Sequence, residues 1–187
     1  MDLKCLKGAT SAYNIFYKCK KTGLIGGSDS VLTMDVTFHH NYYNEVGSRL
    51  PLGRQANMHI YNNYYYKCGT CQDIRANAFV LSEANYFEEC TNPQKVTITS
   101  TYNGTVIKSY GDYLTGCGES MATVVTNRTA SLKGNCKPDG ATDYTNFDTN
   151  SELFYYDSVN QKSNVTLLTD AENAKMDCIK LAGVLKN

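Results

Sequence analysis

The 187-residue chain has no tryptophan, only three prolines and no excess of either charge, since 18 basic side chains balance 18 acidic ones. A balanced chain lacks the overall charge that draws a protein to nucleic acid or to a membrane surface, so we expect neither as a partner. The opening residues MDLKCLKGAT contain no apolar run that could be a signal peptide or a membrane anchor. Any attraction to an anion must therefore be local.

The composition favours β-structure and an oxidising compartment. Fifteen tyrosines with many Asn and Thr suit strands and polar turns better than a helical bundle. Eight cysteines, together with sequons at Asn103, Asn127 and Asn164, indicate a secreted, extracellular protein. Secretion needs a signal, so we expect the front of the protein to lie upstream of Met1. The length fits a single domain over residues 1–187, and a repeat architecture also fits.

A repeat of 22 residues runs through the first half of the chain. The segments VTFHHNYYNEV, MHIYNNYYYKC and VLSEANYFEEC align without gaps. The repeated positions are Asn41, Asn63 and Asn85; Tyr42, Tyr64 and Tyr86; Tyr43, Tyr65 and Phe87; and Val46, Cys68 and Cys90. A less regular copy, YNIFYKC, keeps Asn14 and Cys19 five residues apart, as Asn63 and Cys68 are. The sequence therefore shows four coils.

A period of 22 is too short for a helix pair and suits one coil of a parallel β-helix. Equivalent residues of successive coils then lie about 4.8 Å apart, so Asn amides can form a ladder and aromatic rings can stack. The strand before each Asn alternates: one column holds Val36, Met58 and Val80, with Phe38, Ile60 and Ser82 two residues on, and the other holds Thr37, His59 and Leu81. We expect the first column to be buried and the second to line a surface.

Residues 1–90 form the regular coils of this single domain, and residues 91–187 are less regular. VTITSTYNGTVI and ATVVTNRTASL predict further strands, and GNCKPDGATDYTNFDTNSE predicts a long polar loop. Thr169 and Glu172 form a capping-box pattern before a short helix in ENAKMDCIKLAGVL, with Met176 and Ile179 on its apolar face.

Several reactive residues are weak candidates for chemistry. Cys68 and Cys71, in CGTC, have the spacing of half a metal site or a redox pair, but no second such pair or paired His follows. His39 and His40 are neighbours on a predicted strand, so we expect their side chains on opposite faces, and His59 lies in another column. No nucleophile elbow of a serine hydrolase is present.

The motif SRLPLGR is more unusual. Arg49 and Arg54 flank a Pro in the loop that leaves one coil, and Lys21 holds nearly the same position in the coil before. Three cations on one side suit a polymer of uronic acids, because an Arg fork binds a carboxylate at two points and Lys adds a point charge. A solvated face with ordinary ion pairs is the alternative for the same residues.

Four blocks resemble, in order and spacing, the central part of polysaccharide lyase family 1, the pectate lyases. The blocks are KTGLIGGSDS (21–30), VTFHHNYYN (36–44), SRLPLGR (48–54) and MHIYNNYY (58–65). The resemblance implies an all-β, right-handed, single-stranded parallel β-helix that cleaves polygalacturonate, or pectin, with Ca²⁺. By position it implies that Arg49 is the catalytic base and that Lys21 and Arg54 bind substrate carboxylates.

Calcium is the least complete part of this resemblance. Asp2 matches the last of the family's several calcium-binding Asp residues, and the others are expected upstream of residue 1. One Asp cannot supply the six to eight oxygens that Ca²⁺ takes, so we expect little activity from the chain by itself. The alternative function is a non-catalytic β-helix that binds acidic polysaccharide or self-associates through its open first coil.

Overall fold

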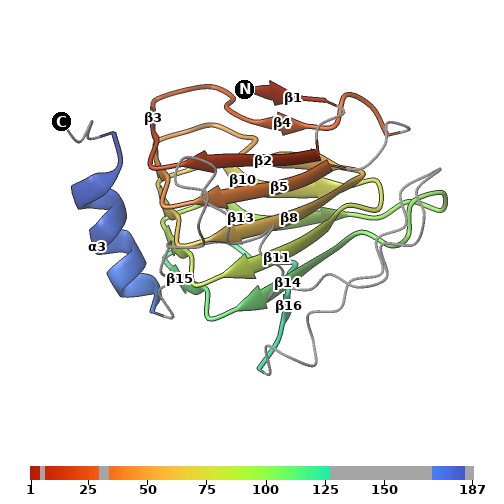
Figure 1. The fold of residues 1–187 in the computed structure, drawn as a ribbon. Coiled ribbons are helices and arrows are strands. Elements are labelled where there is room, and N and C mark those ends of the chain that lie inside the picture. The colour runs from red at the N-terminus through yellow and green to blue at the C-terminus, as the bar shows by residue number, and fades with distance from the viewer. Residues whose placement is uncertain (5–6, 30–33, 127–169, 184–187) are drawn as a thin grey trace.

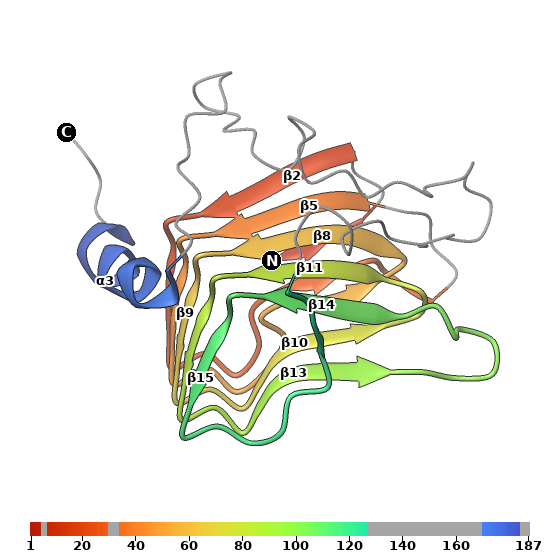
Figure 2. The same cartoon turned by 90° about the horizontal axis from the view of Figure 1, so that it is seen from below.

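The computed structural model describes residues 1–4, 7–29, 34–126 and 170–183. These residues form three parallel sheets wound one after another, with one helix beside them (Figures 1 and 2). Each turn of the chain adds one strand to every sheet, so the strands stack into coils. The parallel β-helix predicted from the 22-residue period is confirmed.

The strands of each sheet follow the order of the coils. The first sheet contains β1 (Asp2–Leu3), β4 (Leu24–Ile25), β7 (Leu52–Arg54), β10 (Thr70–Arg75) and β13 (Asn92–Thr97). The second contains β2 (Lys7–Ala12), β5 (Met34–His39), β8 (Ala56–Tyr61), β11 (Phe79–Glu83), β14 (Val106–Tyr110) and β16 (Thr123–Val124). The third contains β3 (Ile15–Tyr17), β6 (Tyr42–Asn44), β9 (Tyr64–Tyr66), β12 (Tyr86–Glu88) and β15 (Tyr113–Thr115), and the helix is α3 (Ala171–Leu181).

The regular stacking extends further along the chain than the sequence indicated. Strands β12 and β15 pair from Tyr86 with Tyr113, a step of 27 residues, and β3 pairs with β6 by the same step, from Ile15 with Tyr42. The extra residues lie in loops between strands. The expectation that the period fades after residue 91 is therefore wrong: a fifth coil follows in register. The predicted polar loop at 134–152 lies outside the described residues.

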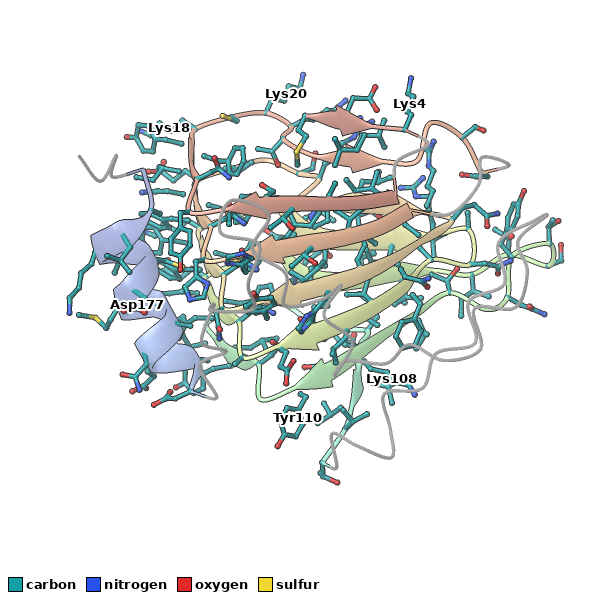
Figure 3. The ribbon with its side chains drawn as sticks, in the orientation of Figure 1. Lys4, Lys18, Lys20, Lys108, Tyr110 and Asp177 are labelled. Atoms are coloured by element: carbon teal, nitrogen blue, oxygen red, sulfur yellow. The ribbon has the colours of Figure 1, made fainter. Side chains whose placement is uncertain are left out.

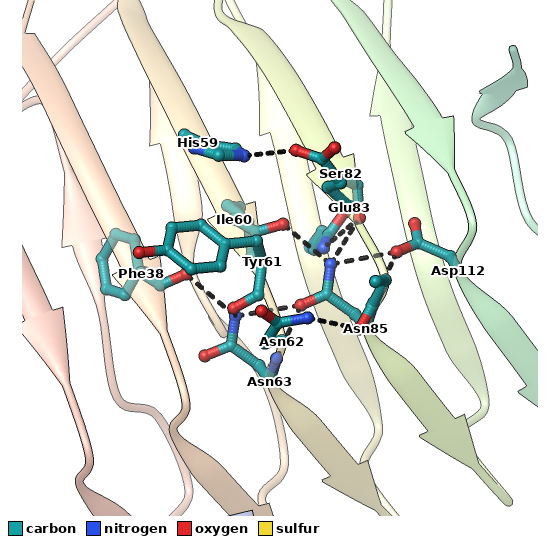
Figure 4. A network of polar contacts seen from close by, with 12 residues as sticks. Phe38, His59, Ile60, Tyr61, Asn62, Asn63, Ser82, Glu83, Asn85 and Asp112 are labelled. Carbon is teal, nitrogen blue, oxygen red and sulfur yellow. Dashed lines mark hydrogen bonds and ion pairs between the residues drawn. The ribbon is translucent and has the colours of Figure 1, made fainter. Parts of the chain in front are cut away.

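A ladder of amides joins the coils at one bend (Figure 4). Side-chain Nδ2 of Asn41 donates to Oδ1 of Asn63 at 3.0 Å, Asn63 donates to Asn85 at 3.0 Å, and Asn85 donates to a carboxylate oxygen of Asp112 at 3.0 Å. Asn14 begins the ladder with a bond of 2.9 Å to Asn41. Because each amide both donates and accepts, the chain of bonds needs a pure acceptor at its end, and Asp112 supplies one.

Replacement of Asn63 by alanine is expected to lower the free energy of unfolding by about 2–4 kcal/mol, because it leaves buried backbone groups without partners. Nδ2 of Asn63 also donates to the carbonyls of Phe38 and Tyr61, and its Oδ1 accepts from the backbone amide of Asn41. Urea unfolding measures the change. Asn92→Ala is the control, since Asn92 is exposed and has one side-chain bond of 3.5 Å, so a loss equal to that of Asn63→Ala would contradict the prediction.

The interior follows the predicted column only in part. Val36, Met58 and Val80 are 0–1% exposed and belong to one apolar cluster, as predicted. The second column, Thr37, His59 and Leu81, is 0–4% exposed, so the expectation that it lines a surface is wrong. In that column the imidazole of His59 contacts a carboxylate oxygen of Glu83 at 2.8 Å, a pairing that allows two polar groups to be buried together.

The aromatic columns stack as expected. Tyr43 lies against Tyr65 with ring centroids 4.9 Å apart and planes within 4°, and Tyr65 lies against Phe87 at 4.5 Å. Tyr86 departs from the pattern and meets Tyr64 edge-on, with planes 80° apart. The Lys175 ammonium of α3 lies over both of these rings and pairs with Glu88, which explains the change.

The C-terminal helix is confirmed, but its buried face is different from the predicted one. Met176 is 48% exposed and Ile179 is 50% exposed, whereas the helix buries Ala171, Ala174 and Cys178 against the third sheet. The helix cap is Asp170, whose carboxylate accepts a hydrogen bond of 2.8 Å from the amide of Glu172, and Thr169 lies outside the described residues. Small side chains on this face let the helix approach the tyrosine rings closely. No helix in the described part of the chain has the length and apolarity to cross a membrane.

Candidate functional site

The loop that carries Arg49 connects β6 with β7 and is held tightly to the coil before it. Arg49 has a positive φ of 65°, and its carbonyl oxygen accepts hydrogen bonds from the Thr22 hydroxyl at 2.6 Å and the Gly23 amide at 2.8 Å. The next amide, of Leu50, donates to the carbonyl of Cys71 in the following coil at 2.9 Å. The backbone at Arg49 is therefore fixed from both sides, which leaves its partly exposed side chain as the variable element.

Lys21 lies next to this loop in the adjacent coil. A parallel bridge pairs Lys21 with Ser48, and Ser48 pairs in turn with Thr70. Lys21 is thus one ladder position away from Arg49, close to the position expected from counting along the repeat. Its side chain is exposed.

Arg54 ends β7 and is partly neutralised by a residue that the sequence analysis did not select. Its Nε lies 3.2 Å from a carboxylate oxygen of Asp29, close enough for an ion pair but not aligned for a hydrogen bond. Asp29 was within reach of sequence reasoning, since it belongs to the KTGLIGGSDS block. Gly26, at φ 83°, lets the chain pass the Arg54 carbonyl, which a Cβ at this position would approach to 2.5 Å.

The outer face of the first sheet collects charged residues in two columns. Interior positions are filled by residues such as Ile25 and Ile74, and side chains alternate along a strand, so the neighbouring positions point outward. One outward column is Asp2, Leu24, Leu52, Asp73 and Lys95. The next is Arg54, Arg75 and Thr97. Asp2 and Arg54 therefore share a face.

Arg75 is the cation that sequence reasoning missed. It pairs with Arg54 in the ladder, although the two are 21 residues apart rather than 22. Its Nη2 donates to a carboxylate oxygen of Asp73 at 2.9 Å, while its buried Nε has no hydrogen-bond partner. The Nε atoms of both arginines thus retain a donor for a further acceptor.

The described residues do not by themselves make a calcium site. The Asp2 carboxylate is half-exposed and lies 3.5 Å from the ammonium of Lys4. In the described part of the chain, the one group of three or more potential metal-ligating side chains is made of cysteines and does not include Asp2. Ca²⁺ takes six to eight oxygens, and one carboxylate supplies at most two.

Other cations lie at the coil-one end of the stack, where Lys4, Lys18 and Lys20 project outward (Figure 3). Two of them have acidic partners: Lys4 pairs with Asp2 at 3.5 Å, and Lys18 pairs with Glu45 at 3.8 Å. Exposed pairs of this kind contribute little to stability and leave the surface close to neutral.

His39 and His40 are not on opposite faces, so that expectation is wrong. Their Nδ1 atoms lie 3.0 Å apart and both residues are 3% exposed. The reason is the backbone: His40 has φ 51°, so the strand ends at His39 and the next side chain turns back. Burial lowers the pKa of His40 from 6.5 to about 4, opposed by the charge of Asp177.

The shifted pKa of His40 predicts a loss of stability in acid. The unfolded chain takes up this proton near pH 6.5 and the folded chain only near pH 4, so stability is complete above pH 6.5 and falls between these values. The expected loss is about 2–3 kcal/mol at pH 4. His40→Asn, which suits a positive φ, should flatten this part of the curve in urea unfolding. An unchanged slope in the variant would show that other groups cause the loss.

The fold and this face together define a β-helix protein with an outward surface suited to an acidic polymer. The chain belongs to the pectate lyase family, whose model matches residues 6–166. Pectate lyase C of Dickeya chrysanthemi is 41% identical over 114 residues, covering 58% of this chain and 28% of that protein. Pectate lyase 3 of Pectobacterium carotovorum is 39% identical over 102 residues, covering 54% and 26%.

Solved structures agree with the sequence relatives. Pectate lyase C from Erwinia chrysanthemi, determined at pH 9.5 with 30 mM Ca²⁺, has a TM-score of 0.69 and 28% identity, over 98% of this chain and 49% of that one. A variant of pectate lyase C in complex with pentagalacturonic acid has a TM-score of 0.61 and 26% identity, over 94% and 46%. The chain spans about half the length of these structures and just over a quarter of the curated relatives it matches.

Proposed function

We propose that this chain forms the arginine-bearing wall of a pectate lyase cleft, and that the protein cleaves polygalacturonate by β-elimination. The observation that carries the proposal is the backbone clamp on Arg49, which places one arginine beside Lys21 and next to a face with two more. A rigid backbone with a projecting side chain is what a positioned base requires.

In the proposed reaction Arg49, in its neutral form, removes the proton on C5 of a galacturonate. The electron pair of that C–H bond forms the C4–C5 double bond, the C4–O bond breaks, and the departing oxygen takes up a proton. Lys21 and Arg54 hold substrate carboxylates, which steadies the negative charge that develops at C6. Arg75, paired with Arg54 in the ladder, extends the same surface by one coil.

Calcium enters the proposal as a cofactor for which Asp2 is one ligand among several. When bound, such an ion would acidify C5 by drawing charge from the C6 carboxylate. Asp2 lies on the face that also bears Arg54, which supports its assignment. The remaining oxygens must come from residues other than the described ones.

We further propose that the protein acts outside the cell, where its polymeric substrate is found. The cysteine content and the sequons support this compartment. The second candidate function, a β-helix that binds acidic polysaccharide without cutting it, is favoured by the incomplete calcium site.

The decisive experiment follows the ultraviolet absorbance of unsaturated product from polygalacturonate, with and without Ca²⁺. The natural protein that contains this chain should give a calcium-dependent rise. The 187-residue chain alone should give little or none, because Asp2 supplies too few oxygens. Binding of polygalacturonate by the natural protein, without any absorbance change at any pH or Ca²⁺ concentration, would establish the non-catalytic function instead.

A further inference from the structure

A line of sulfur atoms runs through the bend between the third and first sheets. Its ladder positions are Cys19, Val46, Cys68, Cys90 and Cys117: the amides that follow three of them, at Gly69, Thr91 and Gly118, donate to the carbonyls of Val46, Cys68 and Cys90 at 2.9 Å. Cys71 approaches this line from three residues downstream of Cys68. The Sγ atoms of Cys68, Cys71 and Cys90 all lie within 4.8 Å of one another, and these residues are 0–1% exposed.

Cys117 continues the line, since its Sγ accepts a hydrogen bond of 3.3 Å from the amide of Cys90. All four residues are free thiols in the structure. Hydrogen bonds from Cys71 and Cys90 lower the pKa of Cys68, whereas burial raises the pKa of Cys71. Cys68 is therefore the thiol in this group that ionises most readily.

Two chemistries suit such a cluster: a thiophilic metal ion or covalent bridging. Three thiolates around a divalent ion leave a net negative charge in an interior lined by Tyr43, Tyr65 and Phe87, and burying an uncompensated charge is costly. A disulfide is neutral and needs no fourth ligand. The apolar surroundings therefore favour bridges over a metal.

The ladder restricts which bridges can form. Neighbouring coils are about 4.8 Å apart and every second coil about 9.6 Å, whereas a disulfide needs Cα atoms within about 7 Å. Cys117 is two coils from Cys68 and Cys71, so Cys90 alone of the three can reach it. Cys19 is separated from Cys68 by the coil that carries Val46. We propose that the four thiols form two disulfides, Cys68–Cys71 within a coil and Cys90–Cys117 between coils.

The bridges need an oxidant, for which a small disulfide such as oxidised glutathione is sufficient. The Cys68 thiolate attacks one sulfur of glutathione disulfide and releases one glutathione thiolate; Cys71 then displaces the second and closes the bridge. The same exchange joins Cys90 to Cys117. Two glutathione disulfides are consumed, four reduced glutathiones are released and four protein thiols are oxidised.

The first bridge would brace the loop that carries Arg49. The carbonyl of Cys71 accepts the hydrogen bond from the amide of Leu50, and the Leu50 side chain is packed in the same cluster as the thiols. A bridge here ties the two ends of the Cys68–Cys71 turn directly beneath that contact. The proposal does not depend on the lyase activity, because it concerns the thiols alone.

Peptide mapping tests the pairing on the unmodified chain. The reduced protein is incubated with oxidised glutathione in enough urea to open the core transiently, alkylated and digested with trypsin. Cleavage after Lys67 and Arg75 places Cys68 and Cys71 in one peptide, 68–75, which should be two hydrogen atoms lighter and unalkylated. Peptide 76–95, with Cys90, should be joined to peptide 109–128, with Cys117. A Cys68–Cys90 link, or four alkylated thiols, would overturn the proposal.

Two variants separate the bridges from general effects of losing a cysteine. Oxidation should raise Tm by about 5–10 °C, mostly through the Cys90–Cys117 loop, and Cys117→Ser should abolish most of that rise while leaving peptide 68–75 bridged. Cys19→Ser, which removes the isolated thiol, should leave both bridges and the rise in place. If one equivalent of Zn²⁺ added to the reduced chain protects Cys68, Cys71 and Cys90 together from alkylation, the cluster is a metal site and the bridge proposal fails.

Discussion

Arg49→Lys is expected to lower kcat for polygalacturonate by about 10²–10⁴-fold in the natural protein that contains this chain, with little change in KM. Lysine keeps the positive charge, so carboxylate binding survives, but its shorter reach and different geometry remove the positioned guanidine. The backbone that presents Arg49 is held by Thr22, Gly23 and Cys71 and should not move. Initial rates over a range of substrate concentrations separate the two parameters.

The matched control is the same substitution at Arg54, five residues further along the same motif. If Arg49 is the base and Arg54 a carboxylate ligand, Arg49→Lys changes kcat and Arg54→Lys changes KM. Circular dichroism and thermal unfolding of both variants guard against loss of fold. Equal effects of the two substitutions on both parameters, or an Arg49→Lys variant with normal kcat, would remove Arg49 from the role of base.

The sequence contained most of the fold because the fold repeats. A strict 22-residue column predicted the coil, the Asn ladder and the aromatic stacks without any structural knowledge. The same counting missed Asp112, which ends the Asn ladder, because the last step is 27 residues and the residue type changes. The signal was present all the same: Asp112 and Cys117 are five residues apart, like Asn85 and Cys90.

Counting also failed where the backbone changes its local geometry. Arg54 and Arg75 are paired although a period of 22 would match Arg54 with Ala76, because one extra residue enters the corner before β11. His40 turns toward His39 because a positive φ ends the strand, and alternation along a strand cannot indicate that. Both errors concern corners, where side-chain direction depends on φ and ψ rather than on hydrophobic pattern.

The site was predictable as a set of residues but not as a set of contacts. Arg49, Lys21 and Arg54 came from a motif and a family resemblance, and the structure places them in neighbouring ladder positions or on one strand and the loop before it. Asp29 and Thr22 are local partners that no periodicity links to the arginines. Likewise, the CGTC spacing gave no indication of Cys90, because the three sulfur atoms meet across a coil boundary.

Arg54→Ala is expected to weaken polygalacturonate binding by about 10–100-fold, because a hydrogen bond to a charged group contributes about 1.5–3 kcal/mol. The effect should appear in KM, or in the dissociation constant measured by calorimetry in the absence of turnover. Arg54 has room for this role: its Nε has no hydrogen-bond partner in the structure, and Asp29 neutralises its charge only from one side. The loss should shrink as salt is added, since a charge–charge contact at a partly exposed site is screened.

Asp29→Asn distinguishes substrate binding from a purely structural role of the same arginine. Asp29 is half-exposed, so its ion pair with Arg54 contributes little to stability, and removing its charge leaves the guanidinium more attractive to an incoming carboxylate. We therefore expect Asp29→Asn to bind polygalacturonate as tightly as the parent or up to about threefold tighter. If Arg54 serves only to pair with Asp29, the two variants should behave alike, and binding in Arg54→Ala should then match that of the parent protein.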